Sequence, residues 1–226
     1  INDSLSVDVY RNTEHMLVTI KATASEEPTQ STPSDICAVV DVSGSMGCEV
    51  QLKTNTGHNE SYGITQLDLV KHALKTIVEC LGPKDRLSLV SFNTSASVRL
   101  EMTLMDTAGK VQANKTIESL SVGGGTNLYD GLLAGMDILS VTASLHRNAA
   151  LFLLTDGVSN YAPPKGEVKT LLAYIDKQGG SLPFTINTFG FGYDLDSVLL
   201  DRISQEGNGS FAFIPDGSFV GKWKRT

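Results

Sequence analysis

The sequence lacks several features that would define a special class of protein. No stretch of its 226 residues approaches the roughly 18 consecutive apolar residues of a membrane-spanning helix, so we expect no direct insertion into a membrane. No cluster of lysine and arginine occurs before residues 222–225, and the formal net charge is −7. This acidic balance argues against nucleic acid and anionic membrane surfaces as partners.

Cysteine and proline are also scarce. Seven prolines and a hydrophobic fraction of 41% fit an ordinary globular core. The three cysteines, Cys37, Cys48 and Cys80, form an odd count without metal-ligand spacing. Cys37 lies in an apolar run and Cys80 near the end of a helical pattern, so we predict that both are buried thiols. Free thiols slightly favour a reducing, cytoplasmic compartment, but four Asn-x-Ser/Thr triplets leave the localisation open.

The N-terminal residues differ in pattern from the rest of the chain. Residues 5–9 and 16–20 alternate between apolar and polar side chains, which predicts a β-hairpin. The segment before residue 35 is rich in Glu, Pro, Ser and Thr, as linkers are. We therefore expect a hairpin and linker over residues 1–34 and a main domain over residues 35–226. Because the sequence begins at Ile1 without Met, we expect a piece of a larger multidomain protein.

The main domain alternates between apolar strands and amphipathic helices. Near-continuous apolar strands separated by helices indicate a mostly parallel sheet covered on both faces. The link between the strands predicted at 87–92 and 98–105 is too short for a parallel crossover, so these two are antiparallel. The sequence predicts an α/β, doubly wound fold with one antiparallel edge strand. The other predicted strands are 36–40, 149–154, 184–189 and 210–214, and the predicted helices are 66–81, 107–120, 128–145, 168–176 and 195–204.

Polar side chains follow the first apolar strand at a spacing of two. Asp41, Ser43 and Ser45 come directly after the run 36–40. Because successive residues of a strand alternate between its faces, these three side chains can converge where the chain leaves the sheet. Carboxylate and hydroxyl oxygens suit a hard cation such as Mg²⁺, and the motif offers no nitrogen or sulfur.

Two further loops are predicted to lie at or beside this edge of the sheet. The glycine-rich loop 123–125 leads to Thr126, and the strand 149–154 leads to Asp156. In open α/β sheets, ligands bind beyond the carboxyl ends of the strands. The set Asp41, Ser43, Ser45, Thr126 and Asp156 resembles the metal-ion-dependent adhesion site (MIDAS) of the von Willebrand factor type A (vWA) family, whose pattern is Asp-x-Ser-x-Ser, then Thr, then Asp. All five positions match in order.

The resemblance implies a Rossmann-like vWA fold and a non-enzymatic, metal-dependent protein-recognition module. The resemblance implies that Ser43 and Ser45 of this chain bind the metal directly. Thr126 would bind it directly or through water. Asp41 and Asp156 would act mainly through ordered water or as acceptors behind the direct ligands. Mg²⁺ is the expected metal, with Mn²⁺ or Ca²⁺ possible. An Asp or Glu carboxylate of a protein partner would complete the coordination.

Each residue also has a simpler interpretation when it is taken alone. The two serines could satisfy backbone groups at a turn, Thr126 could be an ordinary helix N-cap, and Asp156 could belong to a turn. A structural domain with a vestigial metal site is therefore one alternative. A serine hydrolase is a weaker one, because His146, the last histidine, precedes Asp156 in the chain. The glycine loop could cradle a phosphate, but it lacks the lysine of a nucleotide-binding loop.

The sequence departs from the simple family pattern in two places. Polar residues 48–63 form an insertion between the metal motif and the first helix, and we expect it either to shape partner choice or to have no role. At the other end only residues 216–226 remain for the last helix, which is predicted to be short or truncated. The strings 81–92 and 124–128 look like the eukaryotic intracellular branch that accompanies RING or U-box ubiquitin-ligase modules. Similar strings occur in inter-α-trypsin inhibitor heavy chains and bacterial members.

Overall fold

The computed structural model describes residues 5–11, 16–22, 32–53, 59–142, 144, 146–156, 159–192 and 195–214. The chain divides into two compact units, Ile1–Thr32 and Pro33–Thr226. In the first unit, strand β1 (Leu5–Arg11) pairs antiparallel with β2 (Met16–Ala22), as the alternating pattern predicts. Within the described ranges, no helix has both the length and the apolar character needed to cross a membrane.

The second unit is built on a six-stranded sheet. Its strands are β3 (Ser34–Asp41), β6 (Arg86–Phe92), β7 (Ala96–Leu104), β8 (Asn148–Thr155), β9 (Thr185–Phe191) and β10 (Phe211–Ile214). They lie in the order β10-β9-β8-β3-β6-β7, and all neighbours are parallel except β6 and β7. The predicted doubly wound α/β fold with an antiparallel edge strand is confirmed.

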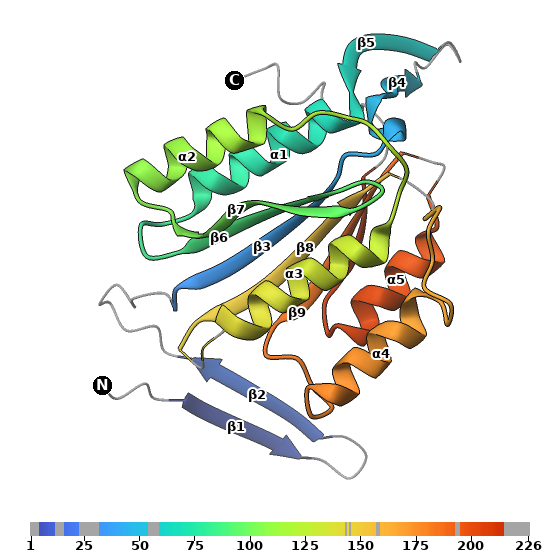
Figure 1. The fold of residues 1–226 in the computed structure, drawn as a ribbon. Coiled ribbons are helices and arrows are strands. Elements are labelled where there is room, and N and C mark those ends of the chain that lie inside the picture. The colour runs from blue at the N-terminus through green and yellow to red at the C-terminus, as the bar shows by residue number, and fades with distance from the viewer. Residues whose placement is uncertain are drawn as a thin grey trace. The chain divides into compact units, whose positions relative to one another are not determined.

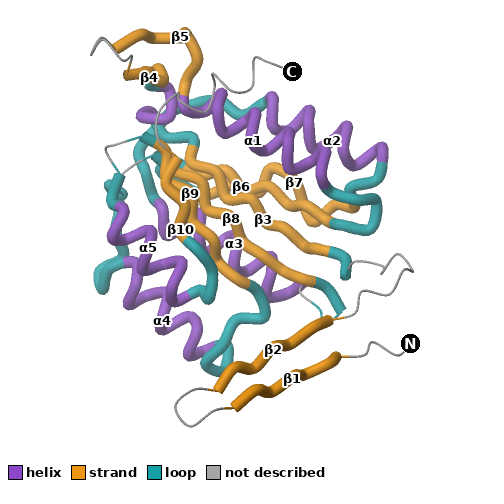
Figure 2. The backbone as a smooth tube through the Cα atoms, turned by 180° about the vertical axis from the view of Figure 1, so that it is seen from behind, coloured by secondary structure: helices purple, strands orange, loops and turns teal. Residues whose placement is uncertain are grey.

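Helices cover both faces of this sheet. They are α1 (Gln66–Cys80), α2 (Thr107–Glu118), α3 (Leu128–Thr142), α4 (Glu167–Lys177) and α5 (Ser197–Glu206). Figures 1 and 2 show α1 and α2 on one face and α3, α4 and α5 on the other. Each face has its own apolar cluster, and the central strand β3 contributes alternate residues to both, as a strand buried on two sides must.

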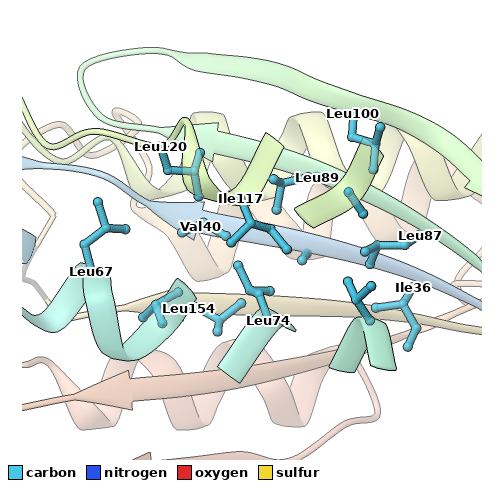
Figure 3. Packing of buried hydrophobic residues seen from close by; sticks show 14 of the residues in the cluster. Ile36, Val40, Leu67, Leu74, Leu87, Leu89, Leu100, Ile117, Leu120 and Leu154 are labelled. Atoms are coloured by element: carbon cyan, nitrogen blue, oxygen red, sulfur yellow. The ribbon is translucent and has the colours of Figure 1, made fainter. Parts of the chain in front are cut away.

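The cluster under α1 and α2 shows how the two helices are held. Leu67 and Leu74 of α1 and Ile117 of α2 pack with Val40 and Leu89 of the sheet (Figure 3). All five side chains are at most 4% exposed. Burial of each contributes roughly 1.5–3 kcal/mol relative to an exposed position, so packing dominates the placement of these helices.

Side-chain caps determine where α1 and α2 begin. At α1 the Thr65 hydroxyl accepts a hydrogen bond from the Asp68 amide (3.1 Å), and the Asp68 carboxylate accepts one from the Thr65 amide (2.9 Å). At α2 the Asp106 carboxylate accepts a hydrogen bond from the Gly109 amide at 2.8 Å. Both helices therefore begin directly after their capping residues, Thr65 and Asp106.

The segment after the metal motif forms structure that the sequence pattern did not predict. A short 3₁₀ helix, η1 (Gly44–Gly47), is followed by β4 (Glu49–Lys53) and β5 (Asn59–Thr65), which pair antiparallel. This two-stranded ribbon lies beside η1 at one end of the main sheet (Figure 1). The predicted insertion 48–63 is thus largely a β-ribbon. The predicted short last helix lies outside the described residues.

Two details of the sequence prediction are wrong. Cys80 is exposed, whereas Cys37 is buried as predicted. The buried positions of α1 are Leu67, Val70, Leu74 and Val78, and Cys80 lies two residues beyond Val78, about 200° further around the helix axis. Helix α3 ends at Thr142, before the predicted end at residue 145.

Candidate metal centre

The candidate centre lies at the carboxyl end of the main sheet. β3 ends at Asp41 and the neighbouring strand β8 ends at Thr155, directly before Asp156. Backbone hydrogen bonds tie the glycine loop to the metal motif: the Gly44 amide donates to the Gly124 carbonyl (3.1 Å), and the Gly123 amide donates to the Val42 carbonyl (2.8 Å). The loop therefore holds its place through its main chain.

Gly124 shows why this loop needs glycine. Its φ is +79°, a backbone conformation that residues with a Cβ rarely adopt. A Cβ there would also lie 3.0 Å from the Thr94 hydroxyl. Glycine at this position therefore allows both the positive φ and the close approach of the loop to the turn between β6 and β7.

Hydrogen bonds link four of the five predicted site residues. Asp41 accepts from the Ser43 amide through Oδ1 (2.8 Å) and from the Thr155 hydroxyl through Oδ2 (2.6 Å). The Ser45 hydroxyl donates to Asp156 Oδ1 (2.9 Å), and the Ser43 and Ser45 hydroxyls lie 3.1 Å apart. Asp41 is thus engaged on both oxygens and orients the motif from behind, while the two serine oxygens stand together in front of it.

Thr126 reaches the same edge on the glycine loop, and its hydroxyl makes no hydrogen bond within the described part of the chain. The side chain is only 4% exposed. The N-cap interpretation of Thr126 is wrong, because Asn127 directly precedes α3 and its Oδ1 accepts from the Asp130 amide at 3.3 Å. No hydrogen bond among these residues joins the Thr126 side chain to the other four, so its hydroxyl is left available to a ligand.

Two residues that the sequence analysis did not single out support the centre. Thr155 donates to Asp41, as described above. Asn160 binds both main-chain groups of Thr126. Its side-chain Oδ1 accepts a hydrogen bond from the Thr126 amide (3.1 Å), and its main-chain amide donates one to the Thr126 carbonyl (2.8 Å). Thr155 was recognisable as the residue at a strand end, but no spacing rule points to Asn160.

The two carboxylates are buried without a neutralising cation. Asp41 is fully buried and Asp156 is 5% exposed. Burial raises the pKa of Asp41 above its ordinary value, and burial together with the charge of Asp41 raises the pKa of Asp156 to about 6. No lysine or arginine among the described residues pairs with either group. Two adjacent, unneutralised carboxylates favour a cation between or beside them.

The chemistry of the donors fits a hard divalent ion. Three hydroxyls and two carboxylates give an all-oxygen set, which suits Mg²⁺ and related ions. The described residues contain no group of three or more His, Cys, Asp or Glu side chains arranged to hold a metal. Of the five donors here only Asp41 and Asp156 are of these four residue types, and the other three are hydroxyls.

The comparisons with known proteins show the family to which the chain belongs. The model of the von Willebrand factor type A domain matches residues 35–220, and the chain belongs to this family. Inter-alpha-trypsin inhibitor heavy chain H2 of Mesocricetus auratus is 32% identical over 187 residues, which cover 78% of this chain and 17% of that protein. The E3 ubiquitin-protein ligase WAV3 of Arabidopsis thaliana is 30% identical over 132 residues, 58% of this chain and 16% of that protein.

Solved structures agree on the fold. A von Willebrand factor type A protein from Catenulispora acidiphila superposes with a TM-score of 0.71 at 21% identity, covering 97% of this chain and 48% of that chain. Proximal thread matrix protein 1 from the mussel byssus, solved with a zinc-occupied MIDAS motif, superposes with a TM-score of 0.55 at 24% identity, covering 80% of this chain and 41% of that chain. The chain spans less than a fifth of the two curated relatives named above.

Proposed function

We propose that the vWA domain is a metal-dependent protein-recognition module whose Mg²⁺ completes its coordination with an Asp or Glu carboxylate of the partner. The observation that carries the proposal is the buried pair Asp41 and Asp156, which no cation of the described residues neutralises, beside the unpartnered hydroxyl of Thr126. A bound divalent ion would relieve the repulsion between the carboxylates and use the free hydroxyl.

The five residues divide the work between direct binding and orientation. Ser43 and Ser45 would bind the ion through their adjacent hydroxyls, and Thr126 directly or through water. Asp41 already accepts two hydrogen bonds, so it would act from behind by holding Ser43 and ordered water. Asp156 accepts from Ser45 and would fix the direction of that hydroxyl.

The partner's charge follows from this division. Neutral hydroxyls as direct ligands leave much of the ion's positive charge uncompensated, so an incoming carboxylate gains a strong, charge-assisted contact. A bound ion would thereby make partner binding metal-dependent. The same logic applies to Mn²⁺ and Ca²⁺, and zinc occupies the corresponding motif in the mussel protein.

The contacts of Ser45 favour recognition over hydrolysis. A nucleophilic serine needs a base that can take its proton, commonly histidine. The Ser45 hydroxyl instead donates to Asp156, and His146 precedes β8 at the amino end of the strand whose carboxyl end leads to Asp156. We therefore assign the domain no enzymatic activity. We further propose that it works within a larger multidomain protein, of the RING or U-box type or of the inter-α-trypsin inhibitor type.

Calorimetric titration with Mg²⁺ tests the metal site. Thr126→Val removes one hydroxyl at nearly constant shape, and Asp41→Ala removes the orienting carboxylate; both should lose most of the binding heat. Thr116→Val on α2 is the matched control, since its hydroxyl bonds only to the Gln112 carbonyl, and it should bind normally. Equal heats in wild type, Thr126→Val and Asp41→Ala would contradict the proposed metal site. Repeating the titration with Mn²⁺, Ca²⁺ and Zn²⁺ ranks the ions.

A peptide array tests recognition separately. Peptides retained in Mg²⁺ should be released by EDTA, and replacing their essential Asp or Glu by Asn or Gln should abolish retention. Retention that survives EDTA would favour the alternative of a structural domain with a vestigial site.

A further inference from the structure

A small cavity lies on the α1–α2 side of the sheet, next to the loops of the candidate metal centre. Its volume is about 160 Å³. Val42, which directly precedes Ser43, forms part of its wall, and so does Ser121, where the chain runs from α2 toward the glycine loop. The remaining polar lining comes from β6, β7 and the turn between them. The cavity shares no lining residue with the five residues of the metal centre.

The lining is rich in hydrogen-bond donors. Four serines, one asparagine and one arginine face the cavity: Ser91, Ser95, Ser97, Ser121, Asn93 and Arg99. No Asp or Glu of the described residues lines it, although the chain has 25 acidic and only 18 basic residues. Hydroxyls can donate or accept, but the guanidinium can only donate. The cavity therefore offers an electropositive, donor-lined surface on an acidic protein.

Ser91 is the buried element of this lining. It is 6% exposed, and no hydrogen bond within the described ranges involves its hydroxyl. Ser97 is its direct partner across the antiparallel pair β6–β7, so both side chains lie on the same face of the sheet. The Ser91 hydroxyl faces the cavity and is available to donate to or accept from a bound molecule.

A shift in the pairing register of β6 and β7 determines the position of Arg99. Val90 pairs with Val98 and Leu89 with Leu100, so Arg99 is the extra residue of a β-bulge in the edge strand. Such bulges redirect a side chain away from the regular alternation. The Arg99 guanidinium forms no ion pair or side-chain hydrogen bond with another described residue. The bulge thus brings an uncommitted positive charge to the cavity.

We propose that this cavity is an anion subsite that binds a tetrahedral oxyanion, a phosphate or sulfate group, through Arg99, Ser91 and Ser97. Its donors come from the turn, from two strands and from the α2–α3 loop, which suits an anion with oxygens in several directions better than a planar carboxylate. The volume is several times the roughly 30 Å³ share of one water molecule, enough for one such group and a few waters. The group is either a free inorganic anion or a phosphorylated side chain of a partner.

Titration of the labelled domain with inorganic phosphate in EDTA, followed by ¹H–¹⁵N NMR, tests the subsite without any metal. Saturable shifts should centre on the amides of residues 91–99 and 121. Arg99→Gln should weaken binding by roughly tenfold or more, and Ser91→Ala by roughly fivefold. Arg202→Gln, which removes an exposed arginine of α5, and Asp41→Asn should leave phosphate binding unchanged. Acetate should bind much more weakly than phosphate.

Unlocalised shifts, equal binding by Arg99→Gln, or equal binding of acetate would overturn the subsite. Because the titration contains EDTA, its outcome is independent of the proposed metal-dependent function. A parallel titration with acetylated phosphoserine amide distinguishes the two sources of the group. Tighter binding than that of inorganic phosphate, lost in Arg99→Gln, supports a phosphorylated partner, and weaker binding supports a free anion.

Discussion

The two ends of strand β3 carry aspartates with the same burial and opposite surroundings. Asp35 and Asp41 are both fully buried. At the amino end, Arg86 and Arg147 donate to Asp35 Oδ1 at 2.8 and 2.6 Å, and Arg86 donates to Oδ2 at 2.5 Å. At the carboxyl end, Asp41 accepts only neutral donors from Ser43 and Thr155.

The pKa values of the two aspartates follow from this difference. Burial alone would raise the pKa of Asp35, but hydrogen bonds and charges from Arg86 and Arg147 outweigh it and hold the pKa below its ordinary value of 3.8. Burial raises the pKa of Asp41, because no positive charge opposes it. A buried carboxylate with its own cations stabilises the fold, whereas one without them costs free energy unless a ligand supplies the cation. The end of the sheet at which we propose a metal site is the uncompensated one.

Removing the compensated carboxylate should have the largest effect on folding. Asp35→Ala leaves two partly buried arginines without their acceptor, so we expect the free energy of unfolding to fall by about 3 kcal/mol. Urea unfolding measures this loss. Mg²⁺ binding at the opposite end of β3 should persist in the folded fraction. If the variant were as stable as wild type, the triad of Asp35, Arg86 and Arg147 would have no structural role.

Removing the uncompensated carboxylate should give the reverse pattern. In EDTA, Asp41→Asn should change the free energy of unfolding by less than about 1 kcal/mol or increase it, because a buried unneutralised charge disappears. With Mg²⁺ at about one hundred times its dissociation constant, wild type should gain roughly 2.7 kcal/mol and Asp41→Asn almost nothing. Thermal unfolding with and without Mg²⁺ provides the comparison. A large loss of stability in EDTA would make Asp41 a structural residue.

The sequence could predict which residues meet at the proposed metal site because their convergence follows from local rules. Asp41, Ser43 and Ser45 leave one strand at a spacing of two, and Asp156 follows the neighbouring strand, so the topology alone brings them to one edge. The contacts of Asn160 with Thr126 depend on how one loop folds over another, which no pattern encodes. The metal itself stays a prediction.

The fold was predictable where hydrophobic periodicity was strong and uncertain where it was not. The six strands of the main sheet and the five α-helices of the second unit appear near their predicted positions. The polar ribbon β4–β5 has no apolar alternation from which it could be predicted. Whether Cys80 is buried or exposed depends on the exact rotation of α1 about its axis. The Asp35 triad escaped notice because its arginines lie 51 and 112 residues away. The position of Arg99 depends on a register shift that only the paired strands show.

Acid should affect the amino end through Asp35. Its folded pKa is lowered, so its contribution to stability is fully present above the unfolded pKa of about 3.8 and is lost as the pH falls through the folded value. Wild type should therefore lose more stability than Asp35→Asn between about pH 5 and pH 2. Urea unfolding at several pH values in EDTA measures both slopes. Parallel curves would show that the arginines do not hold the carboxylate in its charged form.

The smallest effect should come from an ion pair that lacks burial. Lys75 and Glu118 pair across α1 and α2, but their side chains are 38% and 60% exposed. Hydrogen bonding and charge from Lys75 lower the pKa of Glu118, yet water screens the pair. Glu118→Gln should leave the urea midpoint of wild type unchanged within error, at low and high salt. If it destabilised the domain as much as Asp35→Ala does, ion pairing without burial would be sufficient, and the burial of Asp35 would not explain why its pairing with Arg86 and Arg147 matters for stability.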